Sequence, residues 1–486
     1  MITRREFYIN GRWTAPLTTD GALARDCAVI DPSTEEVCAV IALGTEADTN
    51  AAVAAAKAAF TLWAATPLGE RRAAVVRILE HYETRVEDLA RAISMEMGAP
   101  IDMARTSQAP CLPWHLNNFL AAFDQMEWIR PIGPHAPTTQ IALEPIGVVG
   151  LITPWNWPMN QIALKVIPAL LAGCTCVLKP SEESPLSAMI FAELCHDAGL
   201  PPGVFNLVNG DGPGVGSQLS SHPDVEMISF TGSTRAGRAI SIAAAQSLKR
   251  VTLELGGKGA NLVFADADDK AVERGVRHLM NNSGQSCNAP SRMLVERPYY
   301  ERAVTIAADV AASIKVGSAH EPGGHIGPVV NKRQWDQIQG YIQKGIDQGA
   351  RLVAGGPGLP EGFNRGFFIR PTVFADVAPG MTIEREEIFG PVLSIIPFDT
   401  EADAVRIAND TPYGLTNYIQ SQDGARRNRL SRQLRSGMVE MNGQSRGAGA
   451  PFGGVKSSGR AREGGVWGIE EFLEVKAISG FDIAAE

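Results

Sequence analysis

Residues 175–199, TCVLKPSEESPLSAMIFAELCHDAG, contain one complete strand-to-helix unit. Residues 175–179 include the β-branched side chains of threonine and valine, which are typical of a strand. Residues 185–198 carry apolar side chains at helical spacing, and Gly199 marks the end of that helix. The segment therefore predicts a strand followed by a helix.

The same alternation continues on both sides of this unit. We expect further strands at 147–153, 204–208, 227–230 and 250–255, and helices at 159–171, 215–221 and 233–245. A second alternating block runs from 260 to about 439, with expected strands at 261–264, 293–295 and 392–397, and expected helices at 269–281, 299–314, 332–348 and 401–409. Strands that alternate with helices at this pitch predict an α/β fold with parallel, helix-covered sheets.

The remaining segments are expected to surround these two blocks. Short β pieces and turns are predicted before residue 45, and helices at 51–60 and 70–97. Residues 105–145 look less regular, with 140–144 as one arm of a projecting hairpin. A glycine-rich segment at 442–459 leads to a closing strand at 472–478, and no internal repeat is present.

Composition excludes several classes of protein. A chain of 486 residues is too long for one simple core, so two or three lobes are expected. The net charge of -9 and the lack of a dense lysine and arginine run argue against nucleic-acid binding. The longest apolar run, 162–178, is interrupted by Lys165, Pro168 and Gly173, so no membrane span is predicted, and the N-terminus does not read as a signal peptide.

The seven cysteines are scattered and odd in number, which favours a reducing compartment, here taken as the cytoplasm. Cys174 and Cys176 lack a partner pair of metal-ligand residues, so no metal site is predicted. Cys287 differs from the other six, because it lies among small polar residues in NNSGQSCNAPSR, 281–292. Such a setting suits a reactive thiol, although a lone cysteine is more often a small buried apolar residue.

No G-x-G-x-x-G dinucleotide fingerprint follows the first strand of the alternating block. The sequence GDGPG at 210–214 has the wrong spacing, and we interpret it as a turn. A better phosphate site is FTGST at 230–234, where Gly232 permits close approach and Ser233 can cap the next helix. Lys179 and Glu182, also just after a strand, offer groups that can hold ribose hydroxyls.

Taken together, the motifs make the chain resemble the NAD(P)-dependent aldehyde dehydrogenase superfamily nearly from end to end. The matching motifs, in order, are FYINGRW, EPIGVVGLITPWNWP, VLKPSEESP, FTGSTRAG, VTLELGGK, GQSCNAPSR, EEIFGPV and PFGGVKSSGRARE. The resemblance implies a Rossmann-like NAD-binding domain (1–126 and 146–255), a catalytic α/β domain (256–457) and a small β oligomerisation arm (127–145 and 466–486). It also implies a homodimer or homotetramer.

The resemblance implies oxidation of an aldehyde to a carboxylic acid through a cysteine adduct and a thioester. Cys287 would be the nucleophile, and the Asn156 amide with the backbone N–H of Cys287 would stabilise the oxyanion. Glu254 would activate the hydrolytic water, which argues against transfer to coenzyme A. Lys165 and Glu463 match a pair that assists proton movement, and both could equally be structural ion-pair residues.

For the cofactor, the resemblance implies NAD, with NADP possible, because a carboxylate at Glu182 would repel a 2′-phosphate. The implied cofactor residues are Thr153, Pro154, Trp155, Lys179, Ser181, Glu182, Gly212, Phe230, Gly232, Ser233, Leu255, Gly256, Glu387 and Phe389.

The substrate is expected to be a medium-size aliphatic or aromatic aldehyde or a semialdehyde. The expected lining is Trp157, Asn160, Leu164, Asn281 and Arg446. Arg446 could bind a distal carboxylate, or it could point to solvent. Two alternatives are a catalytically silent protein on the same fold, which would not need Cys287, Asn156 and Glu254, and a cofactor-independent esterase, which would leave the KPSE and EEIFGP motifs unexplained.

Overall fold

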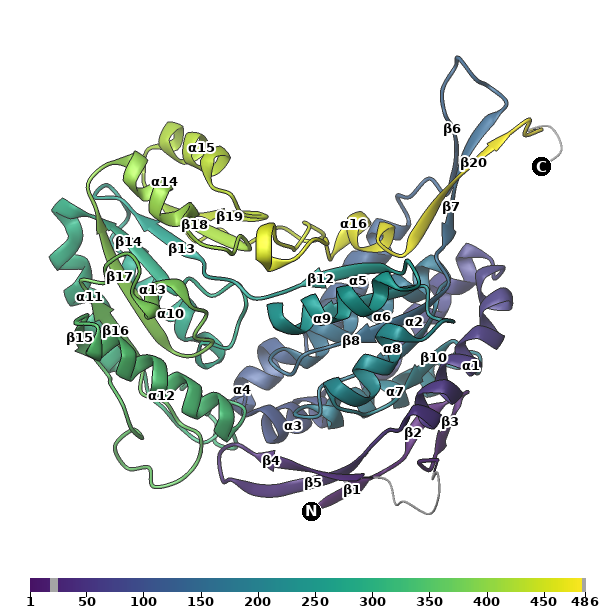
Figure 1. The fold of residues 1–486 in the computed structure, drawn as a ribbon, viewed down its shortest axis with the longest axis horizontal. Helices are drawn as coiled ribbons and strands as arrows, with labels where there is room; N and C mark the ends of the chain where they lie inside the picture. Colours follow the sequence, from purple (N-terminus) through teal and green to yellow (C-terminus); the bar gives the residue numbers. More distant parts are fainter. Residues whose placement is uncertain (18–24, 483–486) are drawn as a thin grey trace.

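The structure is a computed structural model that describes residues 1–17 and 25–482. Residues 18–24 of the expected NAD-binding domain and 483–486 of the expected arm lie outside the described residues. Two large sheets form the body, and a small sheet stands away from it (Figure 1).

The first large sheet contains the strand of the 175–199 unit near its centre. The strand order is β12-β11-β8-β9-β10-β2-β3. The first five strands are parallel, and β2 runs antiparallel to both of its neighbours, β10 and β3. Its strands are β2 (Phe7–Ile9), β3 (Arg12–Thr14), β8 (Val148–Ile152), β9 (Thr175–Lys179), β10 (Phe205–Leu207), β11 (Met227–Thr231) and β12 (Arg250–Glu254). The expected parallel sheet is confirmed.

Helices cover both faces of this sheet. Alternate residues of β9 pack into different cores, since Cys176 and Leu178 contact one cluster and Val177 the other. The helices of the first cluster are α2 (Leu68–Tyr82), α3 (Val86–Met97), α5 (Cys111–Phe123), α6 (Pro158–Ala172) and α7 (Pro185–Asp197). The other face packs against α1 (Glu46–Ala64), α8 (Ser217–Ser221) and α9 (Thr234–Ala245).

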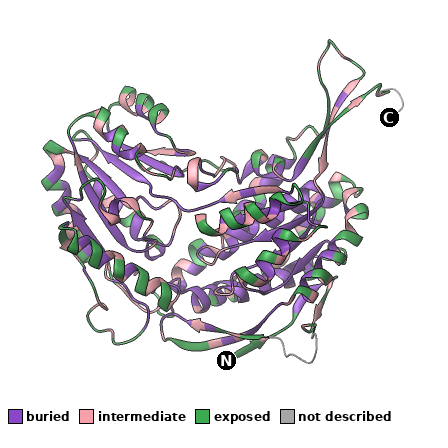
Figure 2. Cartoon of the chain, in the orientation of Figure 1, coloured by how far each residue is buried: buried purple, intermediate pink, exposed green. Residues whose placement is uncertain are grey.

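The second large sheet has the order β15-β16-β17-β14-β13-β18-β19 and is parallel except for β15. Its strands are β13 (Ala260–Val263), β14 (Arg292–Glu296), β15 (Arg351–Ala354), β16 (Thr372–Ala375), β17 (Val392–Phe398), β18 (Thr416–Gln420) and β19 (Met438–Met441). Its helices are α10 (Ala271–Met280), α11 (Tyr300–Ser313), α12 (Lys332–Asp347), α13 (Thr382–Arg385), α14 (Glu401–Asn409) and α15 (Gly424–Gln433). The central strands of both sheets are buried, the edge strands β3 and β15 are partly exposed, and the covering helices are exposed on their outer sides (Figure 2).

Residues 105–145 are more regular than predicted. They contain the helix α5, preceded by α4 (Ile101–Met103) and a π-helical turn, η1 (Ala104–Gln108). The helix was missed because Pro113 lies near its start, where proline is tolerated but interrupts the apolar pattern. The expected helix at 70–97 is also two helices, since the chain turns between α2 and α3.

The projecting sheet has the order β20-β7-β6, from β6 (Ile129–Pro131), β7 (Thr139–Pro145) and β20 (Leu473–Ser479). The closing strand of the chain thus pairs with the hairpin predicted from 140–144 over seven register positions. Another small sheet, β1-β5-β4, comes from β1 (Ile2–Arg4), β4 (Arg25–Asp31) and β5 (Glu36–Leu43).

The glycine-rich segment 442–459 returns from the second sheet to the first. Gly459 pairs with Glu254 at the end of β12, and the amide of Leu255 donates to the carbonyl of Ser458 (2.9 Å). A short helix, α16 (Gly465–Glu470), then packs on α5 and α6. Within the described ranges, every helix is too short or too polar to traverse a lipid bilayer.

Candidate active site

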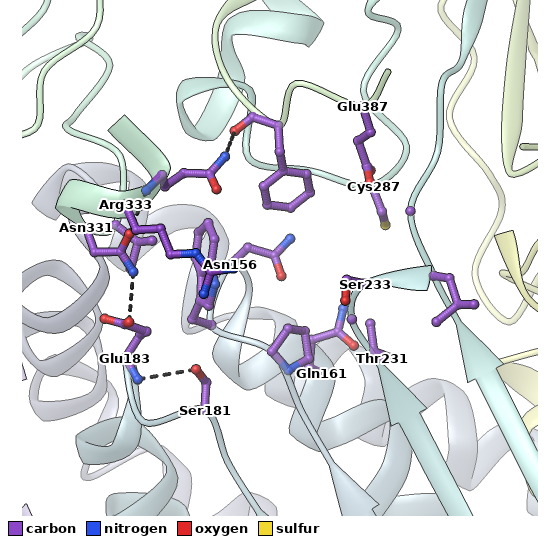
Figure 3. A pocket seen from close by; sticks show the side chains of 18 of the residues that line it. Asn156, Gln161, Ser181, Glu183, Thr231, Ser233, Cys287, Asn331, Arg333 and Glu387 are labelled. Atoms are coloured by element: carbon purple, nitrogen blue, oxygen red, sulfur yellow. Dashed lines mark hydrogen bonds between the residues drawn. The ribbon is translucent and has the colours of Figure 1, made fainter. Parts of the chain in front are cut away.

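Two cavities meet at Asn156, Gln161 and Cys287, which line both of them. One cavity, of about 370 Å³, runs along the carboxyl ends of the strands of the first sheet. The other, of about 400 Å³, lies between α5, α6 and the loop around Arg446. Figure 3 shows Asn156, Cys287 and the strand-end residue Thr231 in one close-up of the first cavity. Ligand positions for two molecules therefore adjoin at one thiol.

Cys287 follows a tight 3-10 turn, η3 (Asn281–Gly284). Three consecutive residues of that turn, Asn282, Ser283 and Gly284, have positive φ angles of 50°, 56° and 74°. A Cβ on Gly284 would lie 2.1 Å from the carbonyl oxygen of Gly390, so only glycine fits there. The turn thus places the partly buried thiol at the boundary of both cavities.

Asn156 lies in the buried turn between β8 and α6. Its Nδ2 donates to the carbonyl oxygen of Gln285 at 2.9 Å. The neighbouring Trp157 donates from Nε1 to Ser286 Oγ at 2.9 Å, so this turn contacts the two residues before the cysteine. An amide nitrogen has two hydrogens, and one remains for a ligand at the cavity boundary.

Glu254 ends β12 and is 3% exposed. Neither of its carboxyl oxygens has a hydrogen-bond partner among the described residues. Burial raises the pKa of Glu254 well above its usual range, and the charge of Glu463 adds to this rise. The raised pKa makes the deprotonated form of this carboxyl group a stronger proton acceptor, which is what a general base requires.

Lys165 and Glu463 form a buried ion pair at the base of the site. The Lys165 ammonium also donates to Thr231 Oγ1 at 2.7 Å, which connects it to the end of β11. Glu463 lines the second cavity, and Lys165 is 1% exposed. Lys165 therefore pairs directly with Glu463, and its charge also acts on Glu254, where it lowers the pKa and so offsets part of the rise.

The thiol of Cys287 is protonated in this environment. Burial raises its pKa to about 12, and the nearby charges of Glu254 and Glu387 add to the rise. Only the thiolate is a strong nucleophile, so the site needs a proton acceptor close to the sulfur. Cys111 lines the second cavity too, and burial raises its pKa to about 12 with no carboxyl group as a further cause.

The first cavity is lined by ten of the fourteen residues predicted for the cofactor. They are Pro154, Trp155, Ser181, Glu182, Gly232, Ser233, Leu255, Gly256, Glu387 and Phe389. Ser233 caps α9 and accepts from the amide of Ala236 at 3.2 Å, as predicted, and it lines the cavity at the start of that helix. Lys179 holds Glu182 in place with an ion pair of 3.1 Å.

The other four predicted cofactor residues do not line the cavity. Lys179, Thr153 and Phe230 are buried next to it, and the Thr153 amide donates to the Lys179 carbonyl at 3.2 Å. Gly212 lies in a separate π-helical turn, η2 (Gly212–Gly216), whose amide at Gly214 is capped by the Asp211 side chain.

The far wall of the first cavity comes from α12 and was not predicted. Asn331, at the start of α12, donates to Glu183 Oε1 at 2.8 Å, so the two large sheets are connected across the cavity (Figure 3). The other unpredicted lining residues are Gln161, Thr231, Val330, Arg333, Gln334 and Gln337. The sequence gives no signal for the three residues on α12, because a polar helical face is more often simply solvated, whereas Thr231 belongs to the FTGST motif already considered for phosphate.

Glu387 points toward the Cys287 loop at the upper end of the first cavity (Figure 3). Its carboxylate accepts from the Gly257 amide at 2.9 Å, and burial raises its pKa to about 7. Gly256 leaves the space in which that carboxylate lies, since a Cβ there would meet Glu387 Oε2 at 2.0 Å. Phe389, with φ of 57°, packs edge-on against Trp155.

All five predicted substrate residues line the second cavity. Trp157, Asn160 and Leu164 come from the start of α6, while Asn281 and Arg446 lie across from them. Several aromatic rings complete the wall: Trp114, His115, Phe119 and Phe452.

Arg446 does not extend freely into solvent. Its Nε donates to Glu440 Oε1 at 3.3 Å, and its guanidinium lies 4.6 Å from the centre of the Phe452 ring. The charge of Arg446 is thus paired within the wall of the cavity.

His115, in the same wall, carries no charge near pH 7, because burial lowers the pKa of this imidazole to about 4.

Among the described residues, no group of three or more histidine, cysteine, aspartate or glutamate side chains is placed to hold a metal ion.

Known proteins resemble the chain over its whole length. A profile of the aldehyde dehydrogenase family matches residues 19–478. A 3-succinoylsemialdehyde-pyridine dehydrogenase from a Pseudomonas species is 47% identical over 480 residues, which cover 98% of this chain and 99% of that protein.

Solved structures agree with that match. An aldehyde dehydrogenase from Bartonella henselae is 60% identical, with a TM-score of 0.97 and coverage of 99% of this chain and 100% of that one. A cysteine-to-alanine mutant of aldehyde dehydrogenase C from Pseudomonas syringae, in complex with NAD+ and octanal, is 49% identical with a TM-score of 0.95, and covers 99% of this chain and 97% of that one. The chain belongs to the aldehyde dehydrogenase family, and it is an enzyme that oxidises aldehydes.

Proposed function

We propose that this enzyme uses NAD to oxidise an uncharged, medium-length aliphatic or aromatic aldehyde to its carboxylic acid, with Cys287 as nucleophile. The observation that supports this most directly is the position of Cys287 and Asn156 at the boundary of two cavities. An oxidation by hydride transfer needs the carbon that reacts to lie between the nucleophile and the hydride acceptor. Two cavities that adjoin at one thiol meet that requirement.

The groups that line the first cavity suit NAD. The start of α9, from Ser233 onward, offers N–H groups for the pyrophosphate, whereas the Gly232 amide already donates to the Glu254 carbonyl at 3.0 Å. Glu182, aligned by Lys179, would accept hydrogen bonds from a free ribose diol and repel a 2′-phosphate, which favours NAD over NADP. Glu387 would hold the second ribose. The relatives crystallised with NAD+ support the same cofactor.

The chemistry then follows from this chain's own groups. Cys287 Sγ attacks the aldehyde carbon while its proton passes to Glu254, the nearby carboxyl group without a bonded partner. The oxygen that becomes negative accepts from Asn156 Nδ2 and from the backbone N–H of Cys287. NAD, when bound, supplies the hydride acceptor.

The resulting thioester is hydrolysed by water. Glu254 first releases the proton taken from Cys287 and then takes the proton of that water, and its raised pKa makes it the stronger acceptor. Protons leave the buried carboxyl group past Lys165 and Glu463, which form an ion pair beside it. The thiol is restored when the acid departs.

The second cavity favours an aldehyde without a distal charge. Arg446 is paired with Glu440, and His115 is neutral near pH 7, so neither offers a free charge to the ligand. A ligand carboxylate would meet a guanidinium whose charge Glu440 already balances through Nε, which reduces the stabilisation that the ligand gains there. The names of two relatives, one acting on a pyridine semialdehyde and one bound to octanal, support a ligand of this size.

The oligomer and the domain roles are also proposals. The sheet of β6, β7 and β20, within the expected arm at 127–145 and 466–486, leaves β20 largely exposed, as in Val475 at 69%, which supports an oligomerisation arm in a homodimer or homotetramer. Residues 1–126 and 146–255 would bind NAD, and 256–457 would supply the cysteine. We further propose a cytoplasmic location, since six other cysteines are free alongside Cys287. Light scattering of the purified chain tests the oligomer.

Absorbance at 340 nm, with NAD or NADP and a panel of aldehydes, tests the reaction. We expect cofactor reduction with octanal and with aromatic aldehydes, and none with Cys287→Ala. Succinic semialdehyde should be the poorer substrate, and Arg446→Ala should reduce kcat/KM similarly for charged and neutral aldehydes. A loss confined to succinic semialdehyde would show instead that Arg446 binds a carboxylate. If no aldehyde is oxidised although calorimetry shows NAD binding, the proposed substrate class is wrong.

A further inference from the structure

A closed network of buried amides surrounds the Asn156 side chain. The carbonyl oxygen of Gln285 accepts from Asn156 Nδ2 at 2.9 Å and from Asn282 Nδ2 at 3.3 Å. Asn282 Nδ2 also donates to the backbone carbonyl of Asn156 at 2.8 Å. One side-chain amide therefore joins the turn that carries the oxyanion donor to the loop that carries the nucleophile.

This network determines which way the Asn156 amide faces. In the observed orientation, one N–H of Asn156 is held by the Gln285 carbonyl and the other is left for an oxyanion. A flipped amide would place Asn156 Oδ1 against that same carbonyl, where two acceptors repel each other. The Gln285 carbonyl thus selects the donor orientation.

The Gln285 peptide is itself fixed by its own side chain. Gln285 Nε2 donates to the Asn282 carbonyl at 3.1 Å, and its Oε1 accepts from the Val330 amide at 3.0 Å. Gln285 is 1% exposed and Asn282 is 3% exposed, so water does not substitute for these bonds.

The backbone at Asn282 has a left-handed conformation that residues other than glycine rarely adopt. Its φ is 50°, and asparagine tolerates this region better than most residues. Ser283 has a similar φ of 56°, but its hydroxyl points elsewhere and donates to the Gly327 carbonyl at 2.7 Å. The two neighbours share one backbone strain and differ in what their side chains hold.

We propose that Asn282 is a positioning residue, which fixes the distance and direction of the Asn156 amide relative to Cys287 by bonding to both segments. This inference rests on the proposed oxyanion role of Asn156. Asn282 touches neither ligand cavity, and it acts only through the two carbonyls that it bridges.

The test compares Asn282→Gly with Ser283→Gly, because glycine keeps the left-handed backbone at no cost and removes only the side chain. A displaced oxyanion donor costs up to about 10²–10³ in kcat, so we expect Asn282→Gly to lower kcat about 10- to 100-fold. Asn282→Asp should lower kcat further, since a carboxylate would face both carbonyls. Ser283→Gly should stay within about threefold. The melting temperature and the calorimetric NAD affinity of each variant monitor the fold and the cofactor site.

A double-mutant cycle with Asn156→Ala separates positioning from general damage. If Asn282 acts through Asn156, adding Asn282→Gly to Asn156→Ala should change kcat less than about threefold. Multiplied losses in the double variant, or a normal kcat for Asn282→Gly, would overturn the inference. A normal kcat for Asn156→Ala would refute the oxyanion role itself, and the inference with it.

Discussion

Replacing Gly256 with alanine should displace one carboxylate in the cofactor cavity and leave the backbone in place. The new Cβ would lie 2.0 Å from Glu387 Oε2 and 2.7 Å from its Cδ. Gly256 has no left-handed φ, so alanine adds no backbone strain. The flexible Glu387 side chain must move, and its hydrogen bond from the Gly257 amide at 2.9 Å is lost.

The size of the effect follows from the hydrogen bond that Glu387 would make to the ribose of NAD, which the displaced carboxylate no longer reaches. A hydrogen bond to a charged group contributes about 1.5–3 kcal/mol, which corresponds to about a 10- to 150-fold change in an equilibrium constant. If Glu387 holds the ribose of NAD, Gly256→Ala should weaken NAD binding by a factor in this range. The melting temperature without cofactor should fall modestly, because the bond from the Gly257 amide to Glu387 is lost while the backbone stays in place.

Calorimetric titration with NAD measures this directly, and KM for NAD gives a second value. Gly340→Ala in α12 is a matched control, because its Cβ would meet no atom within 4 Å. Glu387→Ala should weaken NAD binding to a similar extent, and Gly256→Ala should add little to it. Wild-type NAD affinity in Gly256→Ala would refute the role of Glu387 in holding the cofactor.

Four further predictions concern the reacting groups. Cys287→Ser should lower kcat by about 10⁴ or more while the Kd for NAD is retained, and a smaller loss in steady-state assays would argue for another nucleophile. Wild-type activity should rise as pH rises through the raised pKa of Glu254, because the base works only when deprotonated. Glu254→Gln should abolish this acidic limb of the kcat–pH profile, and an unchanged profile would exclude the role of Glu254 as base. Glu182→Gln should shift the ratio of kcat/KM for NADP over NAD upward by at least about tenfold, since a charge at a few ångströms repels a phosphate by several kcal/mol, and an unaltered ratio would contradict this. Lys165→Met should destabilise the fold by about 3–5 kcal/mol, because Glu463 is left buried without its cation. The double variant Lys165→Met/Glu463→Leu should recover part of that stability, so equal melting temperatures of the two variants would count against the ion pair.

The local signals in the sequence predicted the elements that carry the site. The unit at 175–199 forms as β9 and α7, because a threonine- and valine-rich run and a spaced apolar run both agree with their packing. Ser233 caps α9 as expected from its place after a strand. By contrast, α5 was missed since prolines near its start break the pattern on which helix prediction depends.

Contacts between distant segments could not be predicted in the same way. Asn331 meets Glu183 across the cofactor cavity only because two sheets face each other, and neither residue lies in a distinctive pattern. Asn282 looks like any polar loop residue until its bonds to Asn156 and Gln285 are seen. Gly212 was predicted to bind the cofactor, but the glycine-rich segment around it folds into a capped turn that does not line the cavity.

The return of the glycine-rich segment to β12 has a consequence for how the enzyme matures on the ribosome. Glu254 pairs with Gly459, and Lys165 bonds to Glu463, which is 298 positions later in the chain. Such long-range closures form late in folding. At about 5–20 residues per second, roughly 10–40 s of synthesis separate Glu254 from Gly459. During that interval the first sheet can fold, but Cys287, Glu254 and the Lys165–Glu463 pair are not yet held in their final positions. A nascent chain therefore has no thiol able to react with cellular aldehydes until its last segment has docked.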